Sequence, residues 1–133
     1  MEKICFVIQP FDEENTKRYK SVIKPAIEAA GLKPYRVDED KTVQTPIENI
    51  EKKIKESHIC FADISEDNPN VWYELGFAIA CDKKLVLVCD DKRVKYPFDI
   101  QRKHIIKYTA GTMAGHKNLK KEMTERLKAL AEN

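Results

Sequence analysis

The stretch that decides the fold runs from Ile59 to Cys89 and reads ICFADISEDNPNVWYELGFAIACDKKLVLVC. It opens with an apolar run of strand length, Ile59 to Ile64, and closes with another, Leu85 to Cys89. Between them, the polar loop 65–70 is followed by eleven residues, 71–81, that are typical of a buried helix beginning at Asn68-Pro69. A strand, a helix and a strand in this order predict two parallel strands joined by a crossover helix.

The same alternation continues toward both ends of the chain. Further runs of strand length lie at 4–8, 33–37 and 105–108, and apolar residues recur at helical spacing over 19–30, 47–54 and 119–130. Strands that are apolar throughout and alternate with helices predict a parallel sheet covered on both faces. We therefore predict an α/β fold of the flavodoxin-like type, a three-layer sandwich with a five-stranded parallel sheet in the order 2-1-3-4-5, as one domain over 1–133.

Two helices carry more detailed predictions. Pro25 is expected to kink the helix over 19–30, which Gly31 ends. Thr45-Pro46-Ile47-Glu48 is typical of a capping box, so the next helix is predicted to begin there and to bury one stripe, formed by Ile47, Ile50 and Ile54.

Composition excludes several classes of protein. With 133 residues, 42% hydrophobic and 35% charged, the chain is typical of a globular domain, and a net charge of +2 gives no reason to expect a nucleic-acid partner. No apolar run approaches the roughly 20 residues of a membrane span, and no signal-peptide pattern is seen, so we expect a cytoplasmic protein without a membrane partner. The four cysteines contain no C-x-x-C pair and the three histidines lack metal-ligand spacing, so neither disulfides nor a metal are expected.

Glu74 is the charged residue that the buried helix should not contain. It is the single charge within residues 71–81, and burial of an unpaired carboxylate raises its pKa or demands a partner. A perturbed carboxylate beside a polar loop is a candidate for a catalytic group. The alternative is a structural ion pair, for example with Arg102.

The predicted topology places other polar residues near Glu74. Ligands of such sheets bind beyond the carboxyl ends of the strands, where Gln9-Pro10-Phe11 follows the first strand and Asp63 ends the third. We expect the residues Asp63, Asn68, Asn70 and Glu74 to converge on one pocket with that first loop. The alternatives are structural: Asp63 caps the strand end, Asn68 and Asn70 form a helix cap and turn, and Tyr73 packs. The basic loop 91–104 is interpreted as a solvated loop, with a lid over an anionic ligand as the other reading.

No phosphate-binding glycine motif and no Ser–His or Cys–His arrangement is seen in the predicted site. A carboxylate in a dry pocket can act as a nucleophile, as a base or as a stabiliser of an oxocarbenium ion, and the residues leave these three roles open. The segments FVIQPF at 6–11, IKPA at 23–26, ADI at 62–64, NPNVWYELG at 68–76 and PFD at 97–99 resemble the nucleoside 2-deoxyribosyltransferase-like superfamily. The Glu-Leu helix also resembles prokaryotic TIR-like domains, which hydrolyse NAD.

The resemblance implies a role for each matching residue. Glu74 would attack or stabilise the anomeric carbon, and Asp63 would hold the ribose hydroxyls. Substrate-binding positions would be Gln9, Pro10, Phe11, Asn68, Asn70, Tyr73, Phe98 and Asp99. No cofactor is implied, and NAD enters only as a substrate.

Three hypotheses follow for the function. The first is cleavage or transfer of an N-glycosidic bond in a nucleoside or nucleotide, the second is a TIR-like NAD hydrolase or cyclase in stress or anti-phage signalling, and the third is a non-catalytic nucleotide sensor or assembly module. A homo-oligomer, most simply a dimer, is expected because related transferases complete their sites with a neighbouring subunit.

Overall fold

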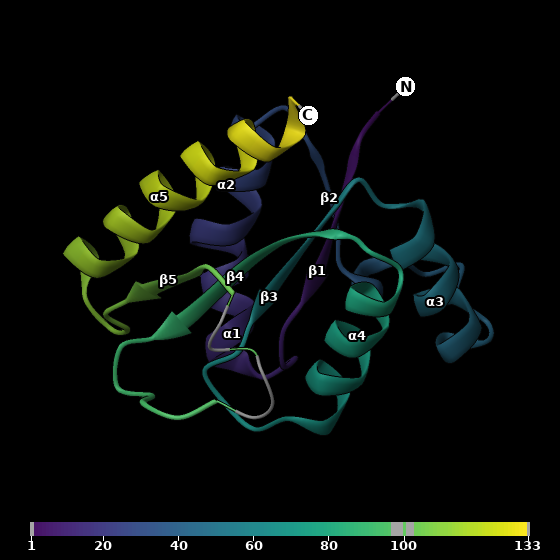
Figure 1. The fold of residues 1–133 in the computed structure, drawn as a ribbon, viewed down its shortest axis with the longest axis horizontal. Coiled ribbons are helices and arrows are strands. Elements are labelled where there is room, and N and C mark those ends of the chain that lie inside the picture. The colour runs from purple at the N-terminus through teal and green to yellow at the C-terminus, as the bar shows by residue number, and fades with distance from the viewer. Residues whose placement is uncertain (1, 97–99, 101–102, 133) are drawn as a thin grey trace.

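The computed structural model describes residues 2–96, 100 and 103–132 and places a parallel sheet between two layers of helices (Figure 1). The five strands lie in the order β2-β1-β3-β4-β5, and every neighbouring pair is parallel. Their bounds are β1 Ile4–Ile8, β2 Lys33–Tyr35, β3 Ile59–Asp63, β4 Lys84–Asp90 and β5 Ile105–Tyr108. The predicted flavodoxin-like class and strand order are confirmed.

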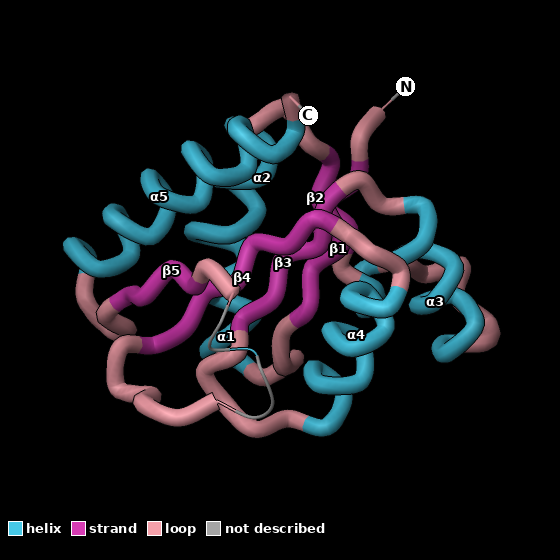
Figure 2. Tube along the Cα trace, in the orientation of Figure 1, coloured by secondary structure: helices cyan, strands magenta, loops and turns pink. Residues whose placement is uncertain are grey.

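The helices divide between the two faces of the sheet (Figure 2). The helical elements are α1 Glu13–Arg18, the π-helical turn Tyr19–Ile23, α2 Lys24–Ala29, the 3₁₀ turn Val37–Glu39, α3 Pro46–Glu56, α4 Pro69–Ala80 and α5 Met113–Ala131. One face is covered by α2 and α5, and the other by α3 and α4. No helix in the described part of the chain is long and apolar enough to cross a membrane.

Side chains alternate between two apolar cores along each strand, because successive residues of a strand point to opposite faces. Val7 and Phe61 belong to the core beneath α2 and α5, whereas Ile8 and Ala62 belong to the core beneath α3 and α4. Both faces of β1 and β3 are thus buried, which explains why these strands are apolar without a polar alternation. The same alternation decides where the residues at the strand ends point.

The first helical segment begins earlier than its apolar pattern does. Asp12 caps it by accepting a hydrogen bond from the Asn15 N–H at 2.8 Å, so the helix includes residues 13–18, which are polar and gave no periodic signal. Pro25 is accommodated by the widened turn just before it, in which the Lys24 N–H donates to the Tyr19 carbonyl five residues earlier. Pro25 has no N–H, so it cannot donate the helical hydrogen bond to the carbonyl of the preceding turn. The π-helical turn lies where this hydrogen bond is missing.

Three local predictions are corrected. The second strand ends at Tyr35 rather than at residue 37, since the chain turns into the 3₁₀ segment Val37–Glu39. Helix α3 buries Ile54, but Ile47 is 60% exposed, because its first turn stands at the mouth of a cavity and not against the sheet. The Thr45 side chain makes no capping hydrogen bond, so the predicted capping box is absent.

Candidate active site

The site is built on the first turns of α4. Asn68 has extended backbone geometry, and its side-chain oxygen accepts hydrogen bonds from the N–H groups of Asn70 at 3.0 Å and Val71 at 3.1 Å. Pro69 fills the first helical position, where no N–H is needed. This cap fixes the start of the helix and therefore the side of α4 on which Glu74 lies.

Glu74 is buried, and the described part of the chain supplies no charged partner for it. Glu74 is 7% exposed, and no described residue forms a hydrogen bond or an ion pair with its carboxyl group. Desolvation by burial raises the pKa of Glu74 to about 7. The predicted burial and raised pKa are confirmed, whereas the alternative pairing with Arg102 falls on a residue outside the described part.

Glu74 faces a cavity of about 490 Å³ at the carboxyl end of the sheet. The loop after β1 and the start of α4 form one part of its wall. The other part is formed by α3 together with Val37, which lies in the 3₁₀ turn after β2. The lining residues are Gln9, Pro10, Phe11, Val37, Pro46, Ile47, Ile50, Asn68, Asn70, Tyr73 and Glu74. All predicted site residues in the first loop and at the start of α4 are therefore brought together, and Glu74 is the one charged residue among the described lining residues.

The mouth of this cavity is apolar and partly aromatic. Phe11, Ile47 and Tyr73 are 47%, 60% and 43% exposed, and all three line this cavity. Exposed apolar side chains that are grouped in this way are typical of binding sites. The guanidinium of the buried Arg36 lies 4.6 Å from the centre of the Phe11 ring, so the ring is supported from within. The Tyr73 hydroxyl donates to Glu51 on α3, which ties the two helices at the mouth. Such a rim suits a flat ring.

Asp63 lies elsewhere, in a second cavity of about 170 Å³. Its carboxylate accepts hydrogen bonds from the Tyr108 hydroxyl at 2.7 Å and from the Ser65 hydroxyl at 2.5 Å, and Arg18 stands 3.8 Å away. Burial raises the pKa of Asp63, although these hydrogen bonds and Arg18 act in the opposite direction.

The predicted meeting of Asp63 and Glu74 in one cavity is wrong for a geometric reason. Asp63 is two residues beyond Phe61 on β3, so it points to the face of α2 and α5, whereas α4 covers the other face. Pro10 lines both cavities, but Asp63 lines only the smaller one and Glu74 only the larger one. A role for Asp63 toward a ribose stays a prediction.

Sequence reasoning missed the partners of Asp63. Asp63 aligns with Val88 of β4, and Val88 aligns with Ile106 of β5, so Tyr108 lies two residues beyond the level of Asp63 on the same face of the sheet. Strand alternation could therefore have placed the two side chains on one face. Arg18 could not be found, because it belongs to the polar first turns of the helix that carry no periodic signal. Ile47 was assigned to the core but lines the mouth of the Glu74 cavity.

The loop after β4 contacts the loop after β3. Arg93 binds Asp67 at 2.6 Å and the Ser65 carbonyl at 3.3 Å, and it lies 5.7 Å from the Trp72 ring. This arginine is therefore engaged in holding two loops together. The predicted substrate-binding residues Phe98 and Asp99 lie outside the described residues.

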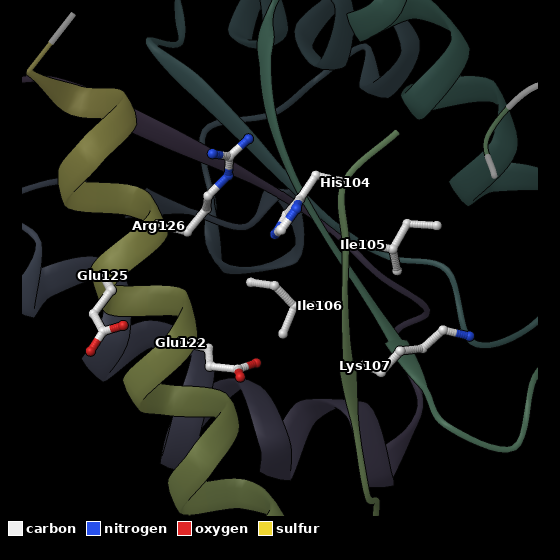
Figure 3. A pocket seen from close by; sticks show the side chains of 7 residues that line it. All are labelled: His104, Ile105, Ile106, Lys107, Glu122, Glu125 and Arg126. Atoms are coloured by element: carbon white, nitrogen blue, oxygen red, sulfur yellow. The ribbon is translucent and has the colours of Figure 1, made fainter. Parts of the chain in front are cut away.

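A larger hollow of about 610 Å³ lies between β5 and α5, away from Glu74 (Figure 3). Figure 3 shows His104, Ile106, Glu122 and Arg126 around it, with charges of both signs and no aromatic rim. It is wider and more open than the Glu74 cavity, and it lacks a buried unpaired acid in its described lining.

No protein-family model matches the chain, and no curated protein sequence matches it. Solved structures do match the chain in fold. The CMP N-glycosidase BcmB of Clostridium botulinum aligns with a TM-score of 0.63 at 22% identity, over 96% of this chain and 98% of that one. The TIR domain of the Toll-related receptor TRR-2 of Hydra magnipapillata gives 0.65 at 14% identity, over 90% and 96%. The heterodimer of the RPS4 and RRS1 TIR domains gives 0.60 at 14% identity, over 100% of both chains.

The fold is shared with both groups. The resemblance found in the sequence is thus confirmed at the level of the fold, because an N-glycosidase and TIR domains are both among the structural neighbours. Identities of this size carry no catalytic residue and no substrate from those proteins to this one.

Proposed function

We propose that this protein cleaves or transfers the N-glycosidic bond of a nucleoside or nucleotide and that Glu74 acts on the anomeric carbon. The observation that carries the proposal is the Glu74 carboxyl group, buried and free of described partners, at the wall of a cavity with an aromatic and apolar mouth. The structural likeness to a CMP N-glycosidase supports the same reading.

The chemistry of C–N cleavage suits such an acid. Departure of the base builds positive charge on the sugar ring, and a fixed carboxylate stabilises that charge most strongly where water is excluded. With a pKa of about 7, Glu74 is ionised in about half of the molecules at neutral pH, and the ionised form can serve as the nucleophile or as the stabilising anion. Phe11 and Tyr73 at the mouth would stack against the base.

The electrostatics of the cavity favour an uncharged nucleoside over a nucleotide. Among the lining residues that the structure describes, there is no lysine or arginine. The N–H groups at the start of α4 are taken up by the Asn68 side chain, and Pro69 has none, so this helix start offers little to a phosphate. A phosphate on the substrate would have to lie outside the cavity.

A second candidate is hydrolysis or cyclisation of NAD. The TIR domains among the structural neighbours favour it, and a nicotinamide ring, which carries a positive charge in NAD, suits a cavity whose charged lining residue is an acid. Glu74 would keep the same role at the ribose carbon. A non-catalytic sensor or assembly module would use the same cavity without turnover.

Chromatography of reaction mixtures tests these alternatives. Purified protein is incubated with nucleosides, nucleoside monophosphates and NAD, and the release of free base or nicotinamide is measured. We expect base release by the unsubstituted protein and a loss on the order of 10³-fold in Glu74→Gln. The matched control is Glu48→Gln, an exposed carboxylate on α3, which should keep full activity.

Release of nicotinamide alone would select the NAD reaction. Equal rates in the protein and in Glu74→Gln would refute both enzymatic proposals.

A further inference from the structure

Strand β5 leaves one backbone edge free at the side of the sheet. It is the last strand in the order β2-β1-β3-β4-β5, and among the described strands it pairs with β4 alone. The Tyr108 carbonyl accepts a hydrogen bond from the Asp91 N–H, so the backbone groups of Tyr108 point toward β4. Because these groups alternate in direction along a strand, those of Ile105 and Lys107 point outward. This edge therefore offers donors and acceptors to another strand.

The opposite edge of the sheet is closed to such pairing. In β2 the Lys33 N–H donates to the Lys3 carbonyl just before β1, so the outward-facing residue of this strand is Pro34. Proline has no N–H, and on an edge strand it prevents the addition of a further strand. The protein thus blocks one edge of its sheet with a proline and leaves the other edge unblocked.

The free edge of β5 borders the hollow of about 610 Å³ beside α5 (Figure 3). Residues from both faces of the sheet line this hollow. Figure 3 shows Ile106 on the side of α5, and Ile105 and Lys107 on the other side of the strand. A hollow that touches both faces of a strand follows its edge, so an added strand would have room there.

The charges in the hollow are arranged to match a second copy of the same surface. Glu122 and Arg126 are one helical turn apart on α5, but their charged groups point apart and form no ion pair with each other in the described structure (Figure 3). Figure 3 also shows Ile106 between their levels. A two-fold axis that passes Ile106 at right angles to the sheet would bring Glu122 of each copy to the level of Arg126 of the other. The hollow is therefore complementary in charge to itself.

We propose that the protein forms a symmetric dimer through β5, in which the two β5 strands pair antiparallel and the sheet continues from one copy into the other. In this register Ile105 lies opposite Lys107 of the second copy, and such a pair exchanges both of its backbone hydrogen bonds. The two α5 helices then flank the axis, with Glu122 facing Arg126 across it. This surface lies away from the Glu74 cavity, so the inference does not depend on the proposed reaction.

Amide exchange followed by NMR tests the strand pairing on the unsubstituted protein. Light scattering over about 1 μM to 1 mM first locates the concentrations at which the mass is 15.4 kDa and twice that value. From monomer to dimer, exchange of the Ile105 and Lys107 amides should slow by at least about tenfold, because both become hydrogen-bonded. The Ile106 amide, which faces β4, is the internal control and should change little.

Charge reversal on α5 tests the symmetry of the contact. Arg126→Glu places carboxylates against each other on both sides of the axis and should raise the Kd of the dimer at least about tenfold. Adding Glu122→Arg reverses both charges and should restore the Kd to within about threefold of the unsubstituted value. Lys120→Glu makes the same change in net charge outside the hollow and should also leave the Kd within about threefold.

A mass of 15.4 kDa at every concentration would overturn the proposal, and this is also the result expected if the edge serves a strand of another protein. A dimer in which the Ile105 and Lys107 amides exchange as fast as in the monomer would overturn it as well. Equal Kd values for Arg126→Glu and Lys120→Glu would do the same. The mass and the exchange rates need no variant, so they do not depend on the folding of one.

Discussion

The Glu74 carboxyl group couples the stability of the protein to pH. Its pKa is about 7 in the folded protein against 4.5 for an ordinary glutamate, so the folded state holds a proton that the unfolded state has lost between these values. Stability from this group is complete below pH 4.5 and falls as the pH rises to about 7. Above that range the folded protein must bury a charge.

This coupling gives a prediction for Glu74→Gln. The variant should gain stability relative to the unsubstituted protein at pH 8, by up to about 3 kcal/mol, and much less at pH 5, because glutamine never ionises. Urea denaturation at both values measures the difference. Glu48→Gln is the control and should change the free energy of unfolding by no more than about 0.5 kcal/mol at either pH. The same gain at pH 5 and pH 8 would mean that the charge is not the cause.

The same ionisation should appear in the reaction. If Glu74 acts as a carboxylate, kcat/KM for base release should rise with pH and level off above a pH of about 7. A pH series with the best substrate of the chromatographic panel measures this. A profile that is flat between pH 5 and 9 would contradict an ionised Glu74 as the reacting group.

At the scale of elements, the cap of α4 positions the site. Asn68→Ala removes the acceptor of two N–H groups and should cost about 1 kcal/mol of stability, while Asn68→Asp keeps the acceptor and should cost much less. Urea denaturation compares the two variants. Equal losses would show that the cap is not what stabilises this helix start.

Two glycines offer a matched test of how closely the elements pack. A Cβ atom on Gly115, in the first turn of α5, would lie 2.1 Å from the Thr109 carbonyl oxygen, whereas one on Gly76, exposed on α4, would meet nothing within 4 Å. Gly115→Ala should therefore destabilise by about 1–3 kcal/mol, and Gly76→Ala should stabilise by up to about 1 kcal/mol. Thermal unfolding measures both, and effects of the same sign would contradict the packing of α5 on the loop before it.

The elements also show where sequence patterns suffice. The strands and the α4 cap could be predicted because apolar runs and an Asn-Pro pair act locally. The start of α1 could not, since its residues are polar and only the Asp12 cap defines it. Ile47 was misplaced because helical spacing identifies a stripe without saying how far the partner sheet extends beneath it.

At the scale of the whole molecule, topology determines which polar residues can meet. The order of the strands follows from alternation and could be predicted, and it correctly brought the β1 loop and α4 to one cavity. The separation of Asp63 from Glu74 depends on which face a strand-end residue takes, and a strand that is apolar on both faces gives no such signal. Gln9 was expected at the site from its place after the first strand and from the resemblance, but the absence of a described partner for its Oε1 is visible only in three dimensions.

The oligomeric state is a prediction at this scale. A dimer should give a mass of about twice 15.4 kDa in light scattering at working concentration. A mass of 15.4 kDa across that range would contradict it.

The hydrogen bonds at Asp63 have a consequence for folding itself. A strand that is apolar on both sides could enter the sheet turned over, with its two rows of side chains exchanged, and lose little apolar burial. Turned over, β3 would bring Asp63 away from Tyr108, so its buried carboxylate would lose a donor at 2.7 Å. The carboxylate of Asp63 therefore favours one of the two orientations in which β3 could join the sheet.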